Sequence, residues 1–258
     1  MQTVILAGGL GTRIAEENYI RPKPMVEIGG QPILWHIMKY YSHYGFNDFI
    51  ICCGYMQHMI KEYFADYYLH RSDITFDFTA GNRMTVHSNV AEPWKVTLVD
   101  TGQMTQTGGR VKRIKRYVGD EPFFLTYGDG VSNIDLNELL RFHSFAKSTV
   151  TISAIQPGGR FGVIDFDNNE NIVGFREKAK EDGGWINAGF MVVEPGIFNY
   201  LTDDSCVLES EPFRRLSKEG KMAAYRHNGF WQCMDTQRDR GMLEQHWQSG
   251  NAPWKVWE

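Results

Sequence analysis

Short apolar runs alternate with longer amphipathic stretches along the first 155 residues of the chain. The apolar runs are dense enough to predict strands that are buried on both faces, as in a parallel sheet. These predicted strands are 3–6, 48–53, 123–127 and 149–154. Between them, apolar residues recur at a helical period, which predicts helices over 33–44, 59–67 and 135–146. Such an alternation of strand and helix is typical of an α/β fold.

The pattern departs from this alternation in two places. Short extended pieces separated by turn residues indicate a small β insertion over 73–101, with pieces at 74–78, 84–87 and 96–99. A basic helix is expected to follow, with Val111, Ile114 and Val118 facing inward. Beyond residue 155, hairpin-like strands alternate with short helices. The strands are 163–166, 172–177, 185–193 and 222–225, and the helices are 195–201, 209–219 and 236–248.

No linker or low-complexity tract separates these parts, so we expect residues 1–258 to form a single domain with one continuous sheet. Within it we distinguish a first half, 1–150, a second half, 151–235, and a C-terminal helix and tail, 236–258. The predicted fold is α/β and Rossmann-like: a mixed, mainly parallel central sheet flanked by helices, with a small β insertion.

The most distinctive polar positions follow the first strand. Leu6-Ala7-Gly8-Gly9-Leu10-Gly11-Thr12-Arg13 lies at the carboxyl end of that strand, where open α/β sheets bind ligands, and Lys23 follows between two prolines. Glycines let backbone N–H groups approach phosphates closely, and Arg13 and Lys23 can neutralise phosphate charge. The loop has neither the Gly-Lys-Ser/Thr ending of a Walker loop nor the third glycine of a dinucleotide fingerprint. It therefore predicts a phosphate site of another kind.

Composition narrows the classes of partner. A formal net charge of −4 argues against binding to nucleic acid or to a membrane surface. No apolar run reaches the roughly 18 residues that a bilayer-spanning helix needs, and Met1 leads into a strand rather than a secretion signal. The four cysteines match neither a disulfide framework nor a zinc motif. We expect a cytoplasmic protein without nucleic-acid or membrane partners.

The glycine loop and Pro22-Lys23-Pro24-Met25 together resemble the signature of the sugar-1-phosphate nucleotidylyltransferases. Within this family the chain is most similar to members that use CTP and glucose 1-phosphate, and the resemblance covers nearly its whole length. It extends through 22–30, 32–38, 49–55, 97–102, 126–130, 159–162 and 252–258. The resemblance implies a Mg²⁺-dependent transfer of CMP from CTP to α-D-glucose 1-phosphate, with release of pyrophosphate. The first half of the chain would bind the nucleotide and the second half the sugar.

The resemblance also implies roles for particular residues. Arg13, Lys23 and Asp129 would be catalytic, and Asp129 and Asp235 would ligate Mg²⁺. Residue chemistry leaves two other roles open, because Asp129 could cap a turn and Asp235 could cap the last helix. The implied substrate-binding residues are Leu6, Ala7, Gly8, Gly9, Gly11, Thr12, Arg13, Lys23, Thr105, Thr107, Gly109, Arg110, Gly128, Arg160, Glu177, Lys178, Asn187 and Trp231.

Sugar and base would be recognised by different segments of this set. Glu177 and Asn187 would bind sugar hydroxyls and Lys178 the sugar phosphate, although Glu177 and Lys178 could equally form a surface ion pair. Ala179 replaces the proline that commonly follows such a pair, which would loosen the turn rather than change the chemistry. Trp231 could stack on the sugar or belong to the core. The segment 105–110 would choose the base, and Arg110 would meet phosphate, in its own site or in a neighbouring subunit.

Two alternatives remain at this stage. The residues alone do not distinguish CTP from UTP or dTTP, and a catalytically silent sugar-nucleotide sensor would keep the same fold. The presence of Lys23, Asp129 and Asp235 argues against the sensor. The β insertion and an aromatic C-terminal tail indicate a homo-oligomer.

Overall fold

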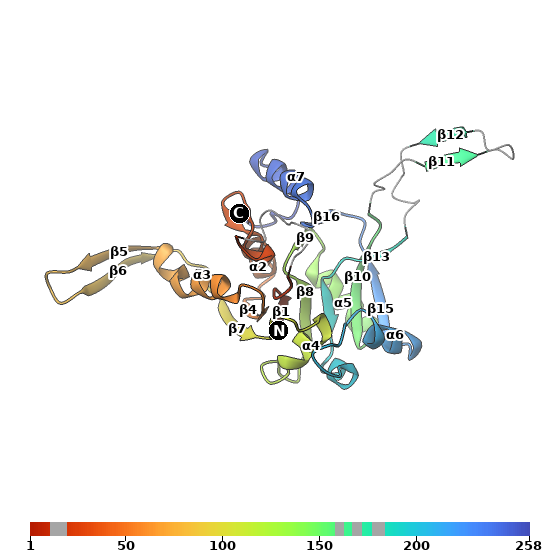
Figure 1. The fold of residues 1–258 in the computed structure, drawn as a ribbon, viewed down its shortest axis with the longest axis horizontal. Helices are drawn as coiled ribbons and strands as arrows, with labels where there is room; N and C mark the ends of the chain where they lie inside the picture. The colour runs from red at the N-terminus through yellow and green to blue at the C-terminus, as the bar shows by residue number, and fades with distance from the viewer. Residues whose placement is uncertain (11–19, 158–162, 167–171, 177–183) are drawn as a thin grey trace.

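A central sheet organises the computed structural model, which describes residues 1–10, 20–157, 163–166, 172–176 and 184–258. Within these residues eight strands form one sheet in the order β7, β4, β1, β8, β14 and β10, with β13 and β15 both paired to β10 (Figure 1). The strands are β1 (Gln2–Leu6), β4 (Asp48–Cys53), β7 (Lys95–Asp100), β8 (Phe123–Tyr127), β10 (Val150–Ile155), β13 (Ile186–Asn187), β14 (Met191–Val193) and β15 (Met222–Arg226). β13 and β14 run antiparallel to their partners, and the other pairs are parallel. The predicted mixed, mainly parallel sheet is confirmed.

Both faces of this sheet are buried, as the dense apolar runs predict. Alternate residues of β1 point to opposite faces, so Ile5 enters one hydrophobic cluster and Val4 the other. Residues of α2, α3, α5, α7 and the C-terminal tail complete the first cluster, and residues of α4, η3 and α6 complete the second. The helices are α2 (Ile33–His43), α3 (Gln57–His70), α4 (Thr107–Arg113), α5 (Leu136–Ala146), α6 (Glu211–Lys218) and α7 (Gln237–Gln248), with 3₁₀ turns η1 (Lys23–Met25) and η3 (Pro195–Tyr200). With both faces covered, the strand ends remain as the places for a ligand.

Three expected elements need correction. The strand expected over 185–193 divides into β13 and β14, because Gly189 and Phe190 have φ of +76° and +45°, outside the extended region. The helix expected to reach Val118 ends at Arg113, although Val118 is still buried. The piece 96–99, expected within the β insertion, lies in β7 at the edge of the main sheet.

The rest of the β insertion is a two-stranded hairpin that projects from one end of the molecule (Figure 1). It consists of β5 (Ser72–Asp77) and β6 (Arg83–Asn89). Phe76 pairs with Met84 and Ile74 with Val86, so these four apolar side chains share one face. Phe76 is 53% exposed and Met84 48% exposed. The hairpin therefore presents an amphipathic sheet whose apolar face meets solvent.

The aromatic tail packs on α2 of its own chain. Trp254 is 1% exposed and its Nε1 donates to Nδ1 of His36 at 3.4 Å. Nε2 of His36 donates in turn to the carbonyl of Ile28 at 2.8 Å. Since one ring nitrogen accepts and the other donates, these contacts fit the neutral imidazole.

Two smaller ribbons connect the main elements: β2 (Glu27–Ile28) pairs with β3 (Gln31–Pro32), and β9 (Gly130–Ser132) pairs with β16 (Trp231–Cys233). A further hairpin pairs β11 (Val163–Phe166) with β12 (Ile172–Arg176), as expected for this stretch. In the described ranges, no helix combines the length and the apolar character needed to cross a bilayer.

Candidate active site

A cleft of about 350 Å³ lies at the carboxyl ends of β1 and β8. Most of its lining comes from the segments that directly follow those strands, together with η1 and the start of α4. The lining residues are Leu6, Ala7, Gly8, Gly9, Lys23, Pro24, Thr105, Gln106, Thr107, Arg110, Tyr127, Gly128, Asp129 and Asp235. The structure thus brings together most of the described residues that the sequence assigned to nucleotide binding.

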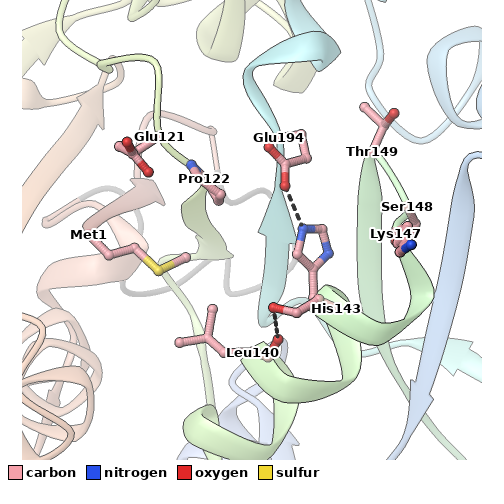
Figure 2. A pocket seen from close by; sticks show the side chains of 10 residues that line it. Met1, Glu121, Pro122, Leu140, His143, Lys147, Ser148, Thr149 and Glu194 are labelled. Carbon is pink, nitrogen blue, oxygen red and sulfur yellow. Dashed lines mark hydrogen bonds and ion pairs between the residues drawn. The ribbon is translucent and has the colours of Figure 1, made fainter.

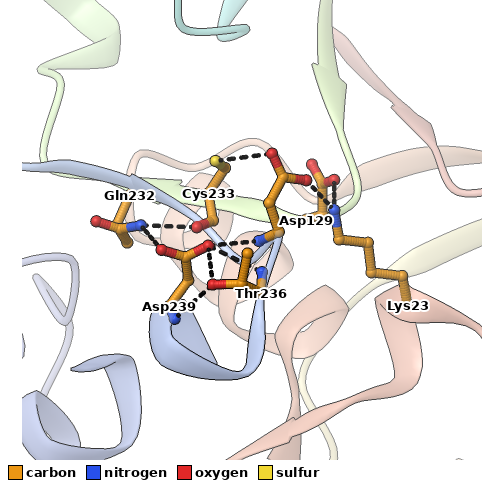
Figure 3. A network of polar contacts seen from close by, with 7 residues as sticks. Lys23, Asp129, Gln232, Cys233, Thr236 and Asp239 are labelled. Atoms are coloured by element: carbon orange, nitrogen blue, oxygen red, sulfur yellow. Dashed lines mark hydrogen bonds and ion pairs between the residues drawn. The ribbon is translucent and has the colours of Figure 1, made fainter. Parts of the chain in front are cut away.

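Lys23 is the electrostatic centre of the cleft. It begins η1 between Pro22 and Pro24, and is 9% exposed. Its Nζ donates to Oδ2 of Asp129 at 2.6 Å and to Oδ1 of Asp235 at 2.5 Å (Figure 3). Burial opposes the charge of this ammonium, but the two aspartates outweigh burial and hold the pKa of Lys23 above its usual value. Lys23 is therefore a fixed cation at neutral pH.

The two aspartates come from distant parts of the chain and meet through the β9–β16 ribbon. Gly130 pairs with Cys233, and the N–H of Met234 donates to the carbonyl of Asp129 at 2.8 Å. This ribbon sets Asp235 beside Asp129. Asp235 does not cap α7, because Thr236 and Asp239 form the capping box there (Figure 3).

The pair of carboxylates fits a hard divalent cation. Both already surround one positive charge, and oxygen is the donor that Mg²⁺ prefers. Among the described residues no group of three or more His, Cys, Asp or Glu side chains could hold a metal alone. Cys233 lies 3.5 Å from Asp235, but burial raises the pKa of its thiol to about 12, which disfavours the thiolate. A cation at this position would draw its remaining ligands from phosphate oxygens and water.

Arg110 is held in a cage of backbone carbonyls and is 4% exposed. Its guanidinium donates to the carbonyls of Gly8 at 2.8 Å and Gly102 at 2.7 Å, and to Oγ1 of Thr101 at 2.8 Å. Longer contacts reach the carbonyls of Gln103 and Cys53, at 3.2 and 3.3 Å. Arg110 was expected from the sequence to bind phosphate. In the structure its guanidinium instead donates these bonds to the protein itself, and they join the glycine loop to the segment after β7.

The segment expected to choose the base reaches the cleft through Thr105, Gln106 and Thr107. Gly109 lies outside the cleft lining. A Cβ added to Gly109 would come within 2.7 Å of the backbone of Asp204. Close packing of α4 on the 204–206 segment thus accounts for this glycine.

On the sugar side, Asn187 lies beside Tyr127, to whose hydroxyl its Nδ2 donates at 3.2 Å. Trp231 packs against the first hydrophobic cluster and its Nε1 donates to the carbonyl of Ala188 at 2.8 Å. The sequence missed Tyr127 as a cleft residue, and it included Gln106 only as part of the segment 105–110. The position of Tyr127 directly before Gly128-Asp129 was the available signal. Six expected site residues lie outside the described residues: Gly11, Thr12, Arg13, Arg160, Glu177 and Lys178.

A second cavity, of about 590 Å³, lies at the amino ends of the strands, opposite the end that holds the cleft (Figure 2). Met1, Pro122 and Thr149 line it, and they precede β1, β8 and β10. His143 bridges Oγ1 of Thr151 at 2.7 Å and Oε1 of Glu194 at 3.2 Å, so its ring is already engaged. Because ligands of open α/β sheets bind at the carboxyl edge, the smaller cleft is the candidate active site.

Sequence comparison places the chain among nucleotide-transferring enzymes. The family model described as "Nucleotidyl transferase" matches residues 2–251. Glucose-1-phosphate cytidylyltransferase of Salmonella typhi is 53% identical over 259 residues, with 100% of both chains covered. The probable glucose-1-phosphate cytidylyltransferase of Bacillus subtilis (strain 168) is 42% identical, again with 100% of both covered.

Solved structures share the fold at low sequence identity. HddC from Yersinia pseudotuberculosis complexed with GMP-PN has a TM-score of 0.70 at 22% identity, covering 95% of this chain and 99% of that one. UDP-glucose pyrophosphorylase complexed with UDP-glucose has a TM-score of 0.69 at 17% identity, covering 96% and 98%.

Proposed function

We infer that this chain, which belongs to the nucleotidyl transferase family, transfers CMP from CTP to α-D-glucose 1-phosphate, giving CDP-glucose and pyrophosphate. The observation that carries the inference is full-length identity of 53% to a glucose-1-phosphate cytidylyltransferase, together with a cleft that gathers Lys23, Asp129 and Asp235. UTP and dTTP are the competing donors, since the residues of segment 105–110 do not by themselves select cytosine.

The reaction requires the protein to position the two substrates and to neutralise charge, and it does not require a general base to remove a proton. A phosphate oxygen of glucose 1-phosphate attacks the α-phosphorus of CTP, the bond to the β-phosphate bridging oxygen breaks, and pyrophosphate leaves with that electron pair. The attacking oxygen is already anionic at neutral pH. Lys23 supplies a fixed positive charge beside the triphosphate, and the loop of Gly8 and Gly9 offers close backbone approach.

Mg²⁺ is the proposed cofactor, held by Asp129 and Asp235. When bound there, it would neutralise charge on the triphosphate and help orient it. The proposal is supported by the two carboxylates that converge on Lys23.

The expected residues outside the described ranges complete the proposed site. Arg13, with Gly11 and Thr12, would bind the triphosphate beside Lys23. Glu177 and Asn187 would bind sugar hydroxyls, Lys178 would bind the sugar phosphate, and Arg160 would line the sugar pocket. Asn187 supports this division, because it borders the cleft at Tyr127.

We further propose that the protein is a cytoplasmic homo-oligomer. The four cysteines are free thiols, as is usual in a reducing compartment. The solvent-facing apolar side chains of the β5–β6 hairpin offer a surface for a second copy.

A pyrophosphate-release assay with each nucleoside triphosphate tests the function. With glucose 1-phosphate and Mg²⁺, CTP is expected to turn over at least tenfold faster than UTP or dTTP. Equal turnover with UTP or dTTP would overturn the cytidine assignment. Binding of CTP and glucose 1-phosphate without release of pyrophosphate would favour a silent sensor.

A further inference from the structure

The cleft is spanned by a chain of hydrogen bonds that meets at Glu209, a residue outside the glycine loop, the metal pair and the sugar segment. Glu209 lies just before α6 and is exposed, while its neighbour Leu208 is fully buried. The backbone of Glu209 is thus anchored next to the core, and its carboxylate reaches outward between two cleft residues.

One carboxylate oxygen of Glu209 contacts Thr107, in the segment expected to choose the base. Oγ1 of Thr107, the first residue of α4, donates to Oε2 of Glu209 at 2.6 Å. The same Oγ1 accepts from the N–H of Leu208 at 2.9 Å, so the hydroxyl hydrogen has a fixed direction. The preceding residue is tied to the same region, because the N–H of Gln106 donates to the carbonyl of Asp204 at 2.8 Å.

The other carboxylate oxygen of Glu209 contacts Tyr127, which in turn contacts Asn187 on the side expected to bind the sugar. The hydroxyl of Tyr127 donates to Oε1 of Glu209 at 2.5 Å and accepts from Nδ2 of Asn187 at 3.2 Å. Oδ1 of Asn187 accepts from the N–H of Gly189 at 3.0 Å, which fixes the amide orientation.

Donors and acceptors match along the whole chain. A carboxylate only accepts, so both hydroxyls must point their hydrogens at Glu209, and Tyr127 is then left to accept from Asn187. Reorienting either hydroxyl removes a charge-assisted bond, which is stronger than a neutral one. A movement of Thr107 on nucleotide binding would therefore reach Asn187 through Glu209.

We propose that Glu209 is a positioning residue that couples the base side of the cleft, through Thr107, to the sugar side, through Tyr127 and Asn187. This rests on the proposed function, because Thr107 and Asn187 must face different substrates. A shift of Thr107 on nucleotide binding moves the Glu209 carboxylate and hence Tyr127 and Asn187. The nucleotide and the sugar phosphate then bind with positive coupling.

Calorimetry with CMP and glucose 1-phosphate tests the coupling without turnover, because CMP has no pyrophosphate to release. In the unmodified protein, saturating CMP is expected to tighten glucose 1-phosphate binding by about fivefold or more, the usual scale of coupling between sites. In Glu209→Gln the amide has one accepting oxygen and one donating nitrogen, so it cannot accept from both hydroxyls as the carboxylate does. The tightening of glucose 1-phosphate binding by CMP is then expected to fall below about twofold. Glu211→Gln, two residues away on α6 and paired with Arg214, is the matched control that keeps the coupling.

Kinetics separate this role from mere structural support. Glu209→Gln should raise the KM for both substrates with the thermal midpoint unchanged, and Tyr127→Phe added to it should cause little further loss of coupling. Undiminished coupling in Glu209→Gln, or additive losses in the double variant, would overturn the proposal. Slow turnover of CTP relative to UTP would overturn only the base assignment, because the binding arm measures CMP and glucose 1-phosphate directly.

Discussion

Asp129 carries the sharpest prediction at the scale of single residues. Asp129→Asn keeps the shape of the side chain but removes half of the negative charge that the two aspartates offer a metal. Turnover at saturating Mg²⁺ is expected to fall by about 100-fold or more, because a bound metal supplies several kcal/mol of charge stabilisation. The fold should be retained, since Lys23 keeps its ion pair with Asp235.

Initial rates of pyrophosphate release, with circular dichroism as the check on folding, measure this effect. Asp120→Asn is the matched control, because Asp120 is exposed and lies outside the cleft lining. Near-normal turnover of Asp129→Asn would remove Asp129 from the metal site.

The residues of the cleft differ in how far the sequence could reveal them. Asp129 closely follows a predicted strand and Lys23 lies between two prolines, so local sequence is sufficient to single them out. Arg110 is surrounded by the carbonyls of Gly8, Cys53, Gly102 and Gln103 and by the hydroxyl of Thr101, groups that approach one another only through the sheet. Glu209 likewise joins residues about 80 to 100 positions away, and no periodic pattern records such a contact.

At the scale of elements, apolar periodicity was sufficient to place the strands and most helices. It failed at β13 and β14, because the run from Ala188 to Val193 stays apolar through a backbone turn. Gly189 permits the positive φ, but Phe190 adopts it as well, and an aromatic residue gives no warning of that conformation. The β9–β16 ribbon was also missed, since its pairing partners are 100 residues apart.

The contact between α2 and the tail makes stability depend on pH. Burial lowers the pKa of His36 to about 4, below its ordinary value of 6.5. The unfolded chain therefore takes up a proton first, and stability present above pH 6.5 is lost as the pH falls towards 4. The expected loss is at most about 1.4 kcal/mol per pH unit across that window.

Thermal melts between pH 7.5 and 4.5 measure this loss. His36→Gln should show a shallower decline of the melting midpoint with falling pH, because it lacks the titrating ring. His58→Gln, at an exposed position of α3, should keep the original slope. Identical slopes for all three proteins would contradict the assignment to His36.

At the scale of the whole molecule, the β5–β6 hairpin is the feature that a single copy leaves unexplained. An isolated two-stranded hairpin is marginally stable in water, yet this one projects from the body with Phe76 and Met84 exposed (Figure 1). A second copy packed against this face would supply the missing layer.

Phe76→Ser is expected to weaken self-association about tenfold or more, because losing an apolar anchor from an interface costs on the order of 1–2 kcal/mol or more. Sedimentation velocity over a range of concentrations measures the shift, and circular dichroism checks the fold. Thr85→Ser, on the opposite face of the hairpin, is the control. A monomeric unmodified protein, or an unchanged assembly of Phe76→Ser, would exclude the hairpin as the interface.

The carbonyl cage around Arg110 gives a structural reason why Gly8 and Gly54 must be glycines. A Cβ at Gly8 would lie 2.1 Å from Nη1 of Arg110, and a Cβ at Gly54 would lie 2.5 Å from the same atom. The guanidinium cannot swing aside without leaving the carbonyls that hold it. Intolerance to mutation at Gly8 would ordinarily be credited to phosphate binding, but the arginine behind it imposes the same restriction from within the protein. Under the proposed function, the glycine signature is constrained on two sides at once, by the nucleotide in front and by Arg110 behind.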